Sequence, residues 1–377
     1  MYQPDYNTLR QERKFSWGVS ASYLSLLEAT GIKIKEMFLS PTAGIELYKT
    51  GRPLIRDMFG PEVMLPAPMT PPISYGHINT LGAELLFPDD GEVNHGILCN
   101  TLKEGIEILQ KPVDFANAGM VPFYLEYRGK MRQAFPDEKV GFAYKGEGPL
   151  TTAYLLRRDE FFYDPYDNPE LTKQFLKLIT DSRIKFDKFL LREIHGLPEV
   201  NNESVWLADD CAAMFSPELW PEFVMPYFEQ YFNAMTTGKR AMHIEDLRPD
   251  QLHFLEQLRL VNYDPSVSPK INPRIISETI QVPFQWRLCN FHYPELSVLE
   301  VADFVYQAVA DGASNVLTSV CHGMCNNESV EKVHSFIAAC KEVERILAQG
   351  GSRDEIRAMV SESGSKKFWN NWPQQVA

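Results

Sequence analysis

The sequence predicts an α/β protein, a TIM-type (β/α)8 barrel with an N-terminal extension. From about residue 140 onward, short apolar runs alternate with amphipathic stretches, which is the pattern of repeated strand–helix units. Six such units fill the C-terminal two-thirds of the chain, and two more can lie upstream. A closed barrel of eight strands typically needs about 250 residues. The 377 residues of the chain therefore hold a barrel and an extension.

The expected strands are short apolar runs, several of which end in polar residues. They cover residues 139–144, 205–209, 240–245, 260–263, 284–289 and 315–321. Two of the intervening helices begin with a capping residue, a proline and an acid, at Asn168 and at Ser216. The second helix carries a broad apolar face over residues 220–235, which we interpret as core packing.

Composition divides the chain into three parts. Residues 1–110 are rich in proline and glycine, and we expect them to form an extension that caps one end of the barrel. Residues 111–349 hold the core of the barrel, and residues 350–377 form a polar tail. The tail carries Trp369 and Trp372, which can dock on the body of the protein or on a second subunit. A homo-oligomer is therefore left open.

Charge and hydropathy exclude several classes of function. No apolar run approaches the roughly 18 residues of a membrane span, and the N-terminus lacks an apolar signal core. We therefore expect a cytoplasmic protein without a membrane partner. The net charge of −13 argues against nucleic-acid binding, so a small molecule or another protein is the expected partner. The six scattered cysteines favour reduced thiols or metal ligands over a disulfide framework.

Candidate metal ligands stand at the ends of two predicted strands. One strand ends in His243 and Glu245, which point to the same side because strand side chains alternate. The last strand ends in Cys321 and His322, which offer a third ligand. Three protein ligands with a fourth position open describe a catalytic zinc site. The alternative interpretation is that His243 and Glu245 form only a hydrogen-bonded pair.

A third strand ends in two neighbouring carboxylates, Asp209 and Asp210. A doubled carboxylate at a strand terminus can relay a proton or orient a ligand. The alternative is structural: one acid caps the following turn and the other is solvated.

These motifs, in this order, resemble the uroporphyrinogen decarboxylase superfamily over roughly residues 140–345. The residues that carry the resemblance are Gly148-Pro149, Asn168-Pro169-Glu170, Ala208-Asp209-Asp210, Ser216-Pro217-Glu218-Leu219-Trp220, Pro226-Tyr227, His243, Cys289-Asn290, Cys321-His322-Gly323 and Val330-Glu331. The resemblance implies a TIM-type barrel whose site lies at the carboxyl ends of the strands.

The superfamily includes zinc methyltransferases that move methyl groups to or from a corrinoid. Their zinc is held by His-x-Cys on one strand and by a cysteine at the end of the last strand, whereas this chain has Glu245 two residues after His243. Residue chemistry favours Cys321 as the third ligand, and the family spacing favours His322. A site with fewer sulfur ligands is a stronger Lewis acid, suited to polarising an oxygen. Of the motif residues, we assign Asn290 and Gly323 to cofactor binding.

The superfamily also includes porphyrinogen decarboxylases. Their N-terminal Met-Arg-Gln-Ala-Gly-Arg motif supplies arginines that bind the carboxylates of the substrate. The nearest string in this chain begins at Met131, in another part of the sequence, and lacks the second arginine. Decarboxylation is therefore the alternative rather than the leading hypothesis.

The leading hypothesis is a corrinoid-dependent methyltransferase, similar to O-demethylases or to coenzyme M methyltransferases. In this hypothesis bound Zn2+ would polarise the oxygen of a small methylated substrate, such as an aromatic methyl ether, and the cobalt of a cobalamin on a separate corrinoid protein would accept the methyl group. Asp209 or Asp210 relays the proton that neutralises the product. Methylamines and thioethers stay open as methyl donors, and so does the reverse transfer toward a thiol acceptor. A barrel that binds a small molecule without catalysis is the further alternative.

Overall fold

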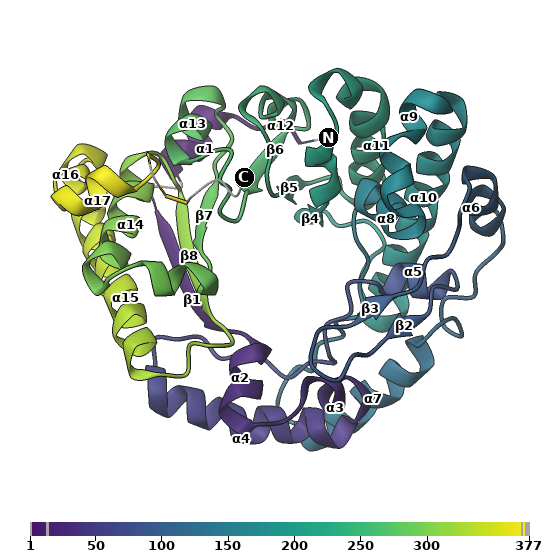
Figure 1. Ribbon diagram of the computed structural model, residues 1–377, viewed down its shortest axis with the longest axis horizontal. Coiled ribbons are helices and arrows are strands. Elements are labelled where there is room, and N and C mark those ends of the chain that lie inside the picture. Colours follow the sequence, from purple (N-terminus) through teal and green to yellow (C-terminus); the bar gives the residue numbers. More distant parts are fainter. Residues whose placement is uncertain (1, 13–14, 371, 374–377) are drawn as a thin grey trace. The chain divides into compact units, whose positions relative to one another are not determined.

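The computed structural model describes residues 2–12, 15–370 and 372–373 and shows an α/β protein (Figure 1). The described residues divide into two compact units. Unit 1 takes them from Met1–Tyr2, Ile32–Glu46 and Ala67–Met242, and unit 2 takes them from Gln3–Gly31, Leu47–Pro66 and His243–Ala377. Segments near both ends of the chain contribute to unit 2. The division into an extension, a barrel core and a tail at residues 110 and 349 stays a prediction.

A parallel sheet in the order β1-β8-β7 forms the centre of unit 2. In its register Ser20 lies opposite Ser319, and Gln285 lies opposite Asn315. Because parallel neighbours run in the same direction, the carboxyl ends of these strands share one edge of the sheet. The unit contains α1 (Tyr6–Glu12), β1 (Ser16–Ala21), α2 (Tyr23–Thr30), α12 (His253–Gln257), β6 (Leu260–Asp264), α13 (Pro273–Thr279), β7 (Gln285–Leu288), α14 (Val298–Ala310), β8 (Asn315–Val320), α15 (Asn327–Ala348), α16 (Arg353–Arg357) and α17 (Glu362–Lys367).

Unit 1 is mostly helical, with α10 packed against α6, α8 and α11 (Figure 1). It contains α3 (Ile34–Leu39), α5 (Gly76–Thr80), the antiparallel pair β2 (Leu85–Leu86) and β3 (Asn94–His95), α6 (Leu102–Leu109), α7 (Val121–Ala134), α8 (Pro149–Arg157), α9 (Asp164–Asp167), α10 (Pro169–Phe189), β4 (Ser204–Ala208) and α11 (Met225–Met235). The strand β5 (Lys239–His243) belongs to unit 1 except for its last residue, and α4 (Pro41–Phe59) contributes residues to both units.

The structure confirms five of the six predicted strands, as β4, β5, β6, β7 and β8. The sixth, at 139–144, is reduced to isolated parallel bridges from Gly141 to Met69 and from Tyr144 to Ile73. The sequence analysis missed β1, which lies in the predicted extension and pairs with β8 along its whole length. Its sequence, SWGVSA, combines glycine with two serines, so its apolar signal is weak.

The helix predicted from residue 217 begins later than expected. Pro217–Leu219 forms a 3-10 turn, Trp220–Val224 forms a π turn, and α11 starts only at Met225. Pro221 and Pro226 explain the interruption, because a proline has no N–H to donate to the preceding turn. The apolar face itself is buried as predicted, with Trp220, Phe228 and Phe232 fully inaccessible.

The tail packs on the body of unit 2. The indole of Trp369 lies 5.5 Å from that of the buried Trp286 and donates a hydrogen bond of 2.8 Å to Asp311. The indole of Trp372 donates a hydrogen bond of 2.7 Å to Glu295 and contacts Phe304. Residues 371 and 374–377 of the predicted tail lie outside the described residues.

Closure of an eight-stranded barrel stays a prediction, because the hydrogen-bonded strands of the described residues are not shown to form a closed sheet. None of the helices in the described residues has the length and apolar character that crossing a membrane requires.

We predict opposite effects on stability for two glycines in helices of unit 1. A Cβ atom on Gly105 in α6 would lie 2.5 Å from the ring of Phe175 in α10, whereas a Cβ atom on Gly129 in α7 would meet no atom within 4 Å. Gly105→Ala should therefore lower the free energy of unfolding by about 1–3 kcal/mol through overpacking. Gly129→Ala should raise it by up to about 1 kcal/mol. Urea denaturation of both variants is the test, and equal stabilisation by both would contradict the packing.

Candidate functional site

The candidate site is built around the imidazole of His243, the last residue of β5. Its Nδ1 lies 3.0 Å from Oδ2 of Asp264, and its Nε2 lies 3.5 Å from Oε1 of Glu245. The side chain of Asp264 is 2% exposed and that of Glu245 is 49% exposed. The buried carboxylate at Nδ1 orients the ring so that Nε2 faces the carboxylate of Glu245.

Asp264, the last residue of β6, holds several groups of this site in place. Its Oδ2 pairs with Nη2 of Arg287 at 2.7 Å, and its Oδ1 accepts the N–H of Ser266 at 2.9 Å. Burial alone would raise the pKa of Asp264, but the hydrogen bond from His243 and the charge of Arg287 outweigh it and lower the pKa to about 2. Asp264 is therefore anionic at neutral pH.

Glu245 is also held as an anion. The hydrogen bond with His243 is the main cause that lowers its pKa, and the hydroxyl of Ser266 and the charge of Arg287 act in the same direction. Two residues on the loops that follow β5 and β6 adopt left-handed backbone conformations, Asp246 at φ 57° and Ser266 at φ 56°. Such strain in residues with a side chain is characteristic of functional loops.

The other two predicted ligands lie on the loop after β8. The Sγ of Cys321 is 3.1 Å from the hydroxyl of Ser22, and the carbonyl of His322 accepts a hydrogen bond of 3.4 Å from Asn290. Glu28 of α2 fixes this loop, because its carboxylate accepts the N–H groups of Gly323 at 2.7 Å and of Cys325 at 3.3 Å.

A cavity of about 320 Å3 lies between this loop and the one that follows β7. Asn290, His322 and Gly323 all line it, together with the exposed Phe291. The structure thus brings together the two residues predicted to bind a cofactor, on loops that follow adjacent strands. Gly323 has a φ of 85°, a conformation that favours glycine.

The predicted zinc ligands are brought together only in part. Two donors bound to one tetrahedral zinc at 2.0–2.2 Å are separated by about 3.3 Å, and His243 Nε2 lies 3.5 Å from Glu245 Oε1. This pair fits a metal ion. Among the residues that the structure describes, however, no three His, Cys, Asp or Glu side chains are arranged to hold one. The third position, at Cys321 or His322, is therefore not supplied by the present arrangement of side chains.

Asp209 and Asp210 lie in unit 1. The carboxylate of Asp209 is fully buried and accepts hydrogen bonds of 2.8 Å from the N–H groups of Leu150 and Thr151 and from the hydroxyl of Thr151. Asp209 therefore caps the first turn of α8. Burial raises its pKa to about 7, although the bonds from Thr151 and Leu150 oppose this. Gly148 permits the close approach, because a Cβ there would lie 2.4 Å from Oδ2 of Asp209.

This capping agrees with the structural alternative for Asp209, except that the helix it caps precedes it in the sequence. Asp210 is exposed and begins the 3-10 turn Asp210–Met214. A role of either residue in proton transfer stays a prediction.

Three residues of the site were not predicted from the sequence: Asp264, Arg287 and Glu28. Asp264 was within reach, since the strand that contains it reads LVNYD and ends in a carboxylate one residue beyond its predicted end. Arg287 lies inside a strand and Glu28 lies in a helix of the predicted extension. Only the folded arrangement shows that Arg287 pairs with Asp264 and that Glu28 binds the loop after β8.

Ionisable side chains gathered at the carboxyl ends of strands are the arrangement that α/β enzymes use. The profile of the family described as uroporphyrinogen decarboxylase (URO-D) matches residues 77–343. The match covers more than half of the chain, so the chain belongs to the uroporphyrinogen decarboxylase family, as its motifs predict.

A methyltransferase from Methanosarcina mazei is similar in structure, with a TM-score of 0.62 and 18% sequence identity over 91% of this chain and 100% of that chain. At this identity the likeness establishes the fold. A protein described as a vitamin-B12-independent methionine synthase from Listeria monocytogenes matches with a TM-score of 0.39 and 14% identity, over 62% of this chain and 72% of that chain. That likeness carries no argument. No curated protein matches the chain.

We predict that Asp264→Ala destabilises the protein, because it leaves the guanidinium of Arg287 without its carboxylate in a partly buried position. The expected loss in free energy of unfolding at pH 7 is about 3 kcal/mol. Glu245→Ala is the control, since its side chain is half exposed and its loss should cost less than about 1 kcal/mol. Denaturant titrations followed by circular dichroism measure both, and equal losses would rule out the structural role of Asp264.

Proposed function

We propose that this member of the uroporphyrinogen decarboxylase family is a zinc-dependent methyltransferase that moves a methyl group between a small methylated substrate and the cobalt of a corrinoid protein. The observation that carries the proposal is the His243–Glu245 pair, whose donor atoms have the spacing of two ligands of one zinc ion. The buried Asp264 at Nδ1 adds the carboxylate–histidine arrangement that metal-binding histidines use. The Methanosarcina mazei methyltransferase has a similar fold, so the fold is compatible with methyl transfer.

Zinc, when bound, would supply a Lewis acid for the leaving atom of the substrate, most simply the oxygen of a methyl ether, aromatic ethers included. The residues of the chain have separate tasks. His243 and Glu245 would hold the metal, with Cys321 or His322 as the third ligand after a rearrangement of the loop that follows β8. Asp264 would orient the imidazole and hold the proton on Nδ1, so that Nε2 would face the metal.

The remaining predicted residues take supporting roles in the proposal. Asn290 and Gly323, which line one cavity, would contact the corrinoid cofactor. Asp209 or Asp210 would deliver the proton that neutralises the product, and the pKa of Asp209, near 7, suits a proton carrier at neutral pH. We also propose that the strands close into the (β/α)8 barrel of the family and that the protein works in the cytoplasm.

Decarboxylation of a porphyrinogen is the second candidate, because the family is described by that activity. It would require cationic groups that bind the carboxylates of the substrate. Arg287 is one cation of the candidate site, but its charge is matched by Asp264 at 2.7 Å. Lys332 lines the cavity between the loops and is paired with Glu328 at 2.5 Å. The pairing favours the methyltransferase over the decarboxylase.

The test is a methyl-transfer assay with the whole chain loaded with zinc. Mixed with a reduced corrinoid and a panel of methyl ethers, methylamines and thioethers, the protein should produce the absorption of methylcobalt with at least one donor. His243→Ala and Glu245→Ala should each lower the rate by several orders of magnitude. His253→Ala, which removes an exposed histidine of α12, should leave the rate unchanged.

Two outcomes would contradict the proposal. Release of carbon dioxide from a porphyrinogen without added metal would assign the chain to the decarboxylases. Binding of a methylated ligand without turnover, unaffected by His243→Ala, would indicate a barrel that binds without catalysis.

A further inference from the structure

Four arginines line a second cavity of unit 2, away from the candidate site. Its volume is about 580 Å3, and it lies beside the segments that lead into β7 and β8. Arg10 comes from α1, Arg274 from α13, and Arg353 and Arg357 from α16. Candidate site residues occupy the carboxyl ends of the same strands, and a strand of six residues such as β8 spans about 20 Å. The two locations are therefore separate.

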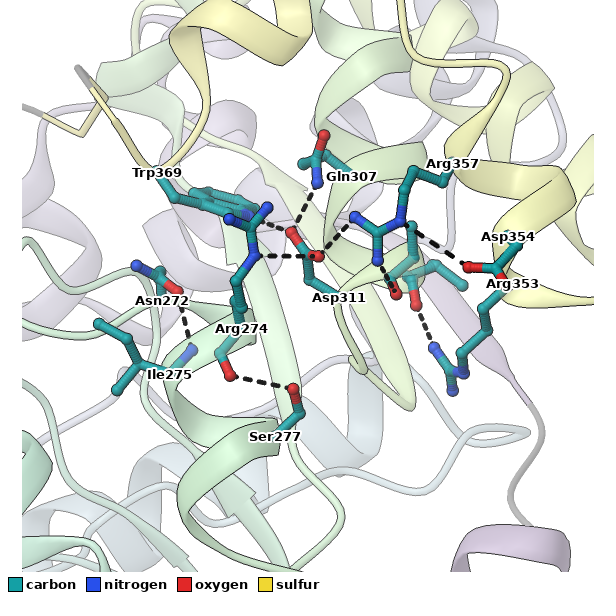
Figure 2. Close-up of polar contacts among 12 residues, drawn as sticks. Asn272, Arg274, Ile275, Ser277, Gln307, Asp311, Arg353, Asp354, Arg357 and Trp369 are labelled. Carbon is teal, nitrogen blue, oxygen red and sulfur yellow. Dashed lines mark hydrogen bonds and ion pairs between the residues drawn. The ribbon is translucent and has the colours of Figure 1, made fainter.

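One carboxylate, that of the buried Asp311, organises this cavity (Figure 2). Its Oδ1 accepts a hydrogen bond of 2.8 Å from Arg357, and its Oδ2 accepts bonds of 2.6 Å from Gln307 and 2.8 Å from Trp369. Figure 2 shows Asp311 between Arg357 and Arg274, whose Nε lies 3.5 Å away. Since Asp311 is saturated by these partners, it neutralises about one of the four positive charges.

Two other arginines donate to main-chain carbonyls, which carry no full negative charge. Arg10 donates to the carbonyls of Gln281 at 2.9 Å and of Ile280 at 2.7 Å. Arg353 donates to the carbonyls of Val309 and Ala313. Burial lowers the pKa of Arg353, and the charge of Arg10 lowers it further, so the two guanidinium groups repel each other.

Arg274 presents donors to the cavity. Its side chain is 52% exposed, and its two terminal nitrogens have no hydrogen-bond partner among the described residues. The other acid that lines the cavity is Glu278, so four arginines face two carboxylates there. Asp354 approaches Arg357 to 4.0 Å, but its side chain is 95% exposed to solvent, which screens it. Glu256 acts on Arg10 from outside the cavity. The excess of positive charge is therefore that of the lining residues, in a chain with a net charge of −13.

We infer that this cavity binds a phosphoryl group, either of inorganic phosphate or of a small phosphorylated molecule. Guanidinium forks match phosphate oxygens through two parallel N–H donors, and clustered arginines are the usual means of holding a dianion. The hydroxyls of Ser277 and Ser314 also line the cavity and add polar groups. The volume exceeds the needs of one phosphate ion, so an organic portion can be accommodated.

The test is calorimetric titration of the whole chain with inorganic phosphate, pyrophosphate and phenyl phosphate. We expect saturable binding of one molecule per chain that weakens as sodium chloride is added. Arg274→Ala should weaken binding by about tenfold or more, because it removes a charge-assisted donor pair. Arg274→Lys should restore part of the affinity. Arg192→Ala removes an exposed arginine of unit 1 and is the matched control, which should bind as the unaltered chain does.

Each outcome bears on the inference. Arg274 is half exposed, so its variants should unfold at the same temperature as the unaltered chain in the absence of phosphate. Tighter binding of phenyl phosphate would identify phosphorylated organic molecules as ligands, and tighter binding of phosphate would identify the free ion. Absence of saturable binding, or equal affinity in Arg274→Ala, would overturn the inference and leave the arginines with the structural role of tying α1 and α16 to the sheet.

Discussion

The buried carboxylate of Asp264 is the group on which the candidate site depends. It orients the imidazole of His243, neutralises Arg287 and accepts the backbone N–H of the strained Ser266. A carboxylate so deep in the protein is stable only because these partners together outweigh the cost of removing it from water. The same contacts leave Nε2 of His243 facing Glu245, which is the feature on which the proposal of zinc binding rests.

The second part of the site is set by main-chain contacts. Glu28 binds two N–H groups of the loop that follows β8, and Asn290 bonds to the carbonyl of His322 on the same loop. Neither contact orients the thiol of Cys321 or the imidazole of His322. These contacts hold the backbone of the loop, and the thiol of Cys321 contacts the hydroxyl of Ser22. The proposed zinc site would therefore be completed only by a rearrangement when the ion binds.

Sequence patterns predicted the strands well where apolar runs were uninterrupted, and they located His243, Glu245, Asn290 and Gly323 at strand ends. They failed where the signal was tertiary. The strand β1 combines glycine and serine and is stabilised by its pairing with β8. The site residue Arg287 reads as an isolated charge within a strand, and its role follows from a contact with Asp264, 23 residues away in the sequence. The sequence predicts Asp209 as a polar residue at the end of a strand. Only the folded structure shows that its carboxylate caps α8.

The measurement that tests the account most directly is the zinc content of the purified protein, determined by mass spectrometry together with that of a His243→Ala/Glu245→Ala double variant. The account predicts about one zinc ion per chain in the unaltered protein and none in the folded double variant. Absence of bound metal after incubation with excess zinc, or equal metal content in both proteins, would contradict the assignment of His243 and Glu245 as ligands.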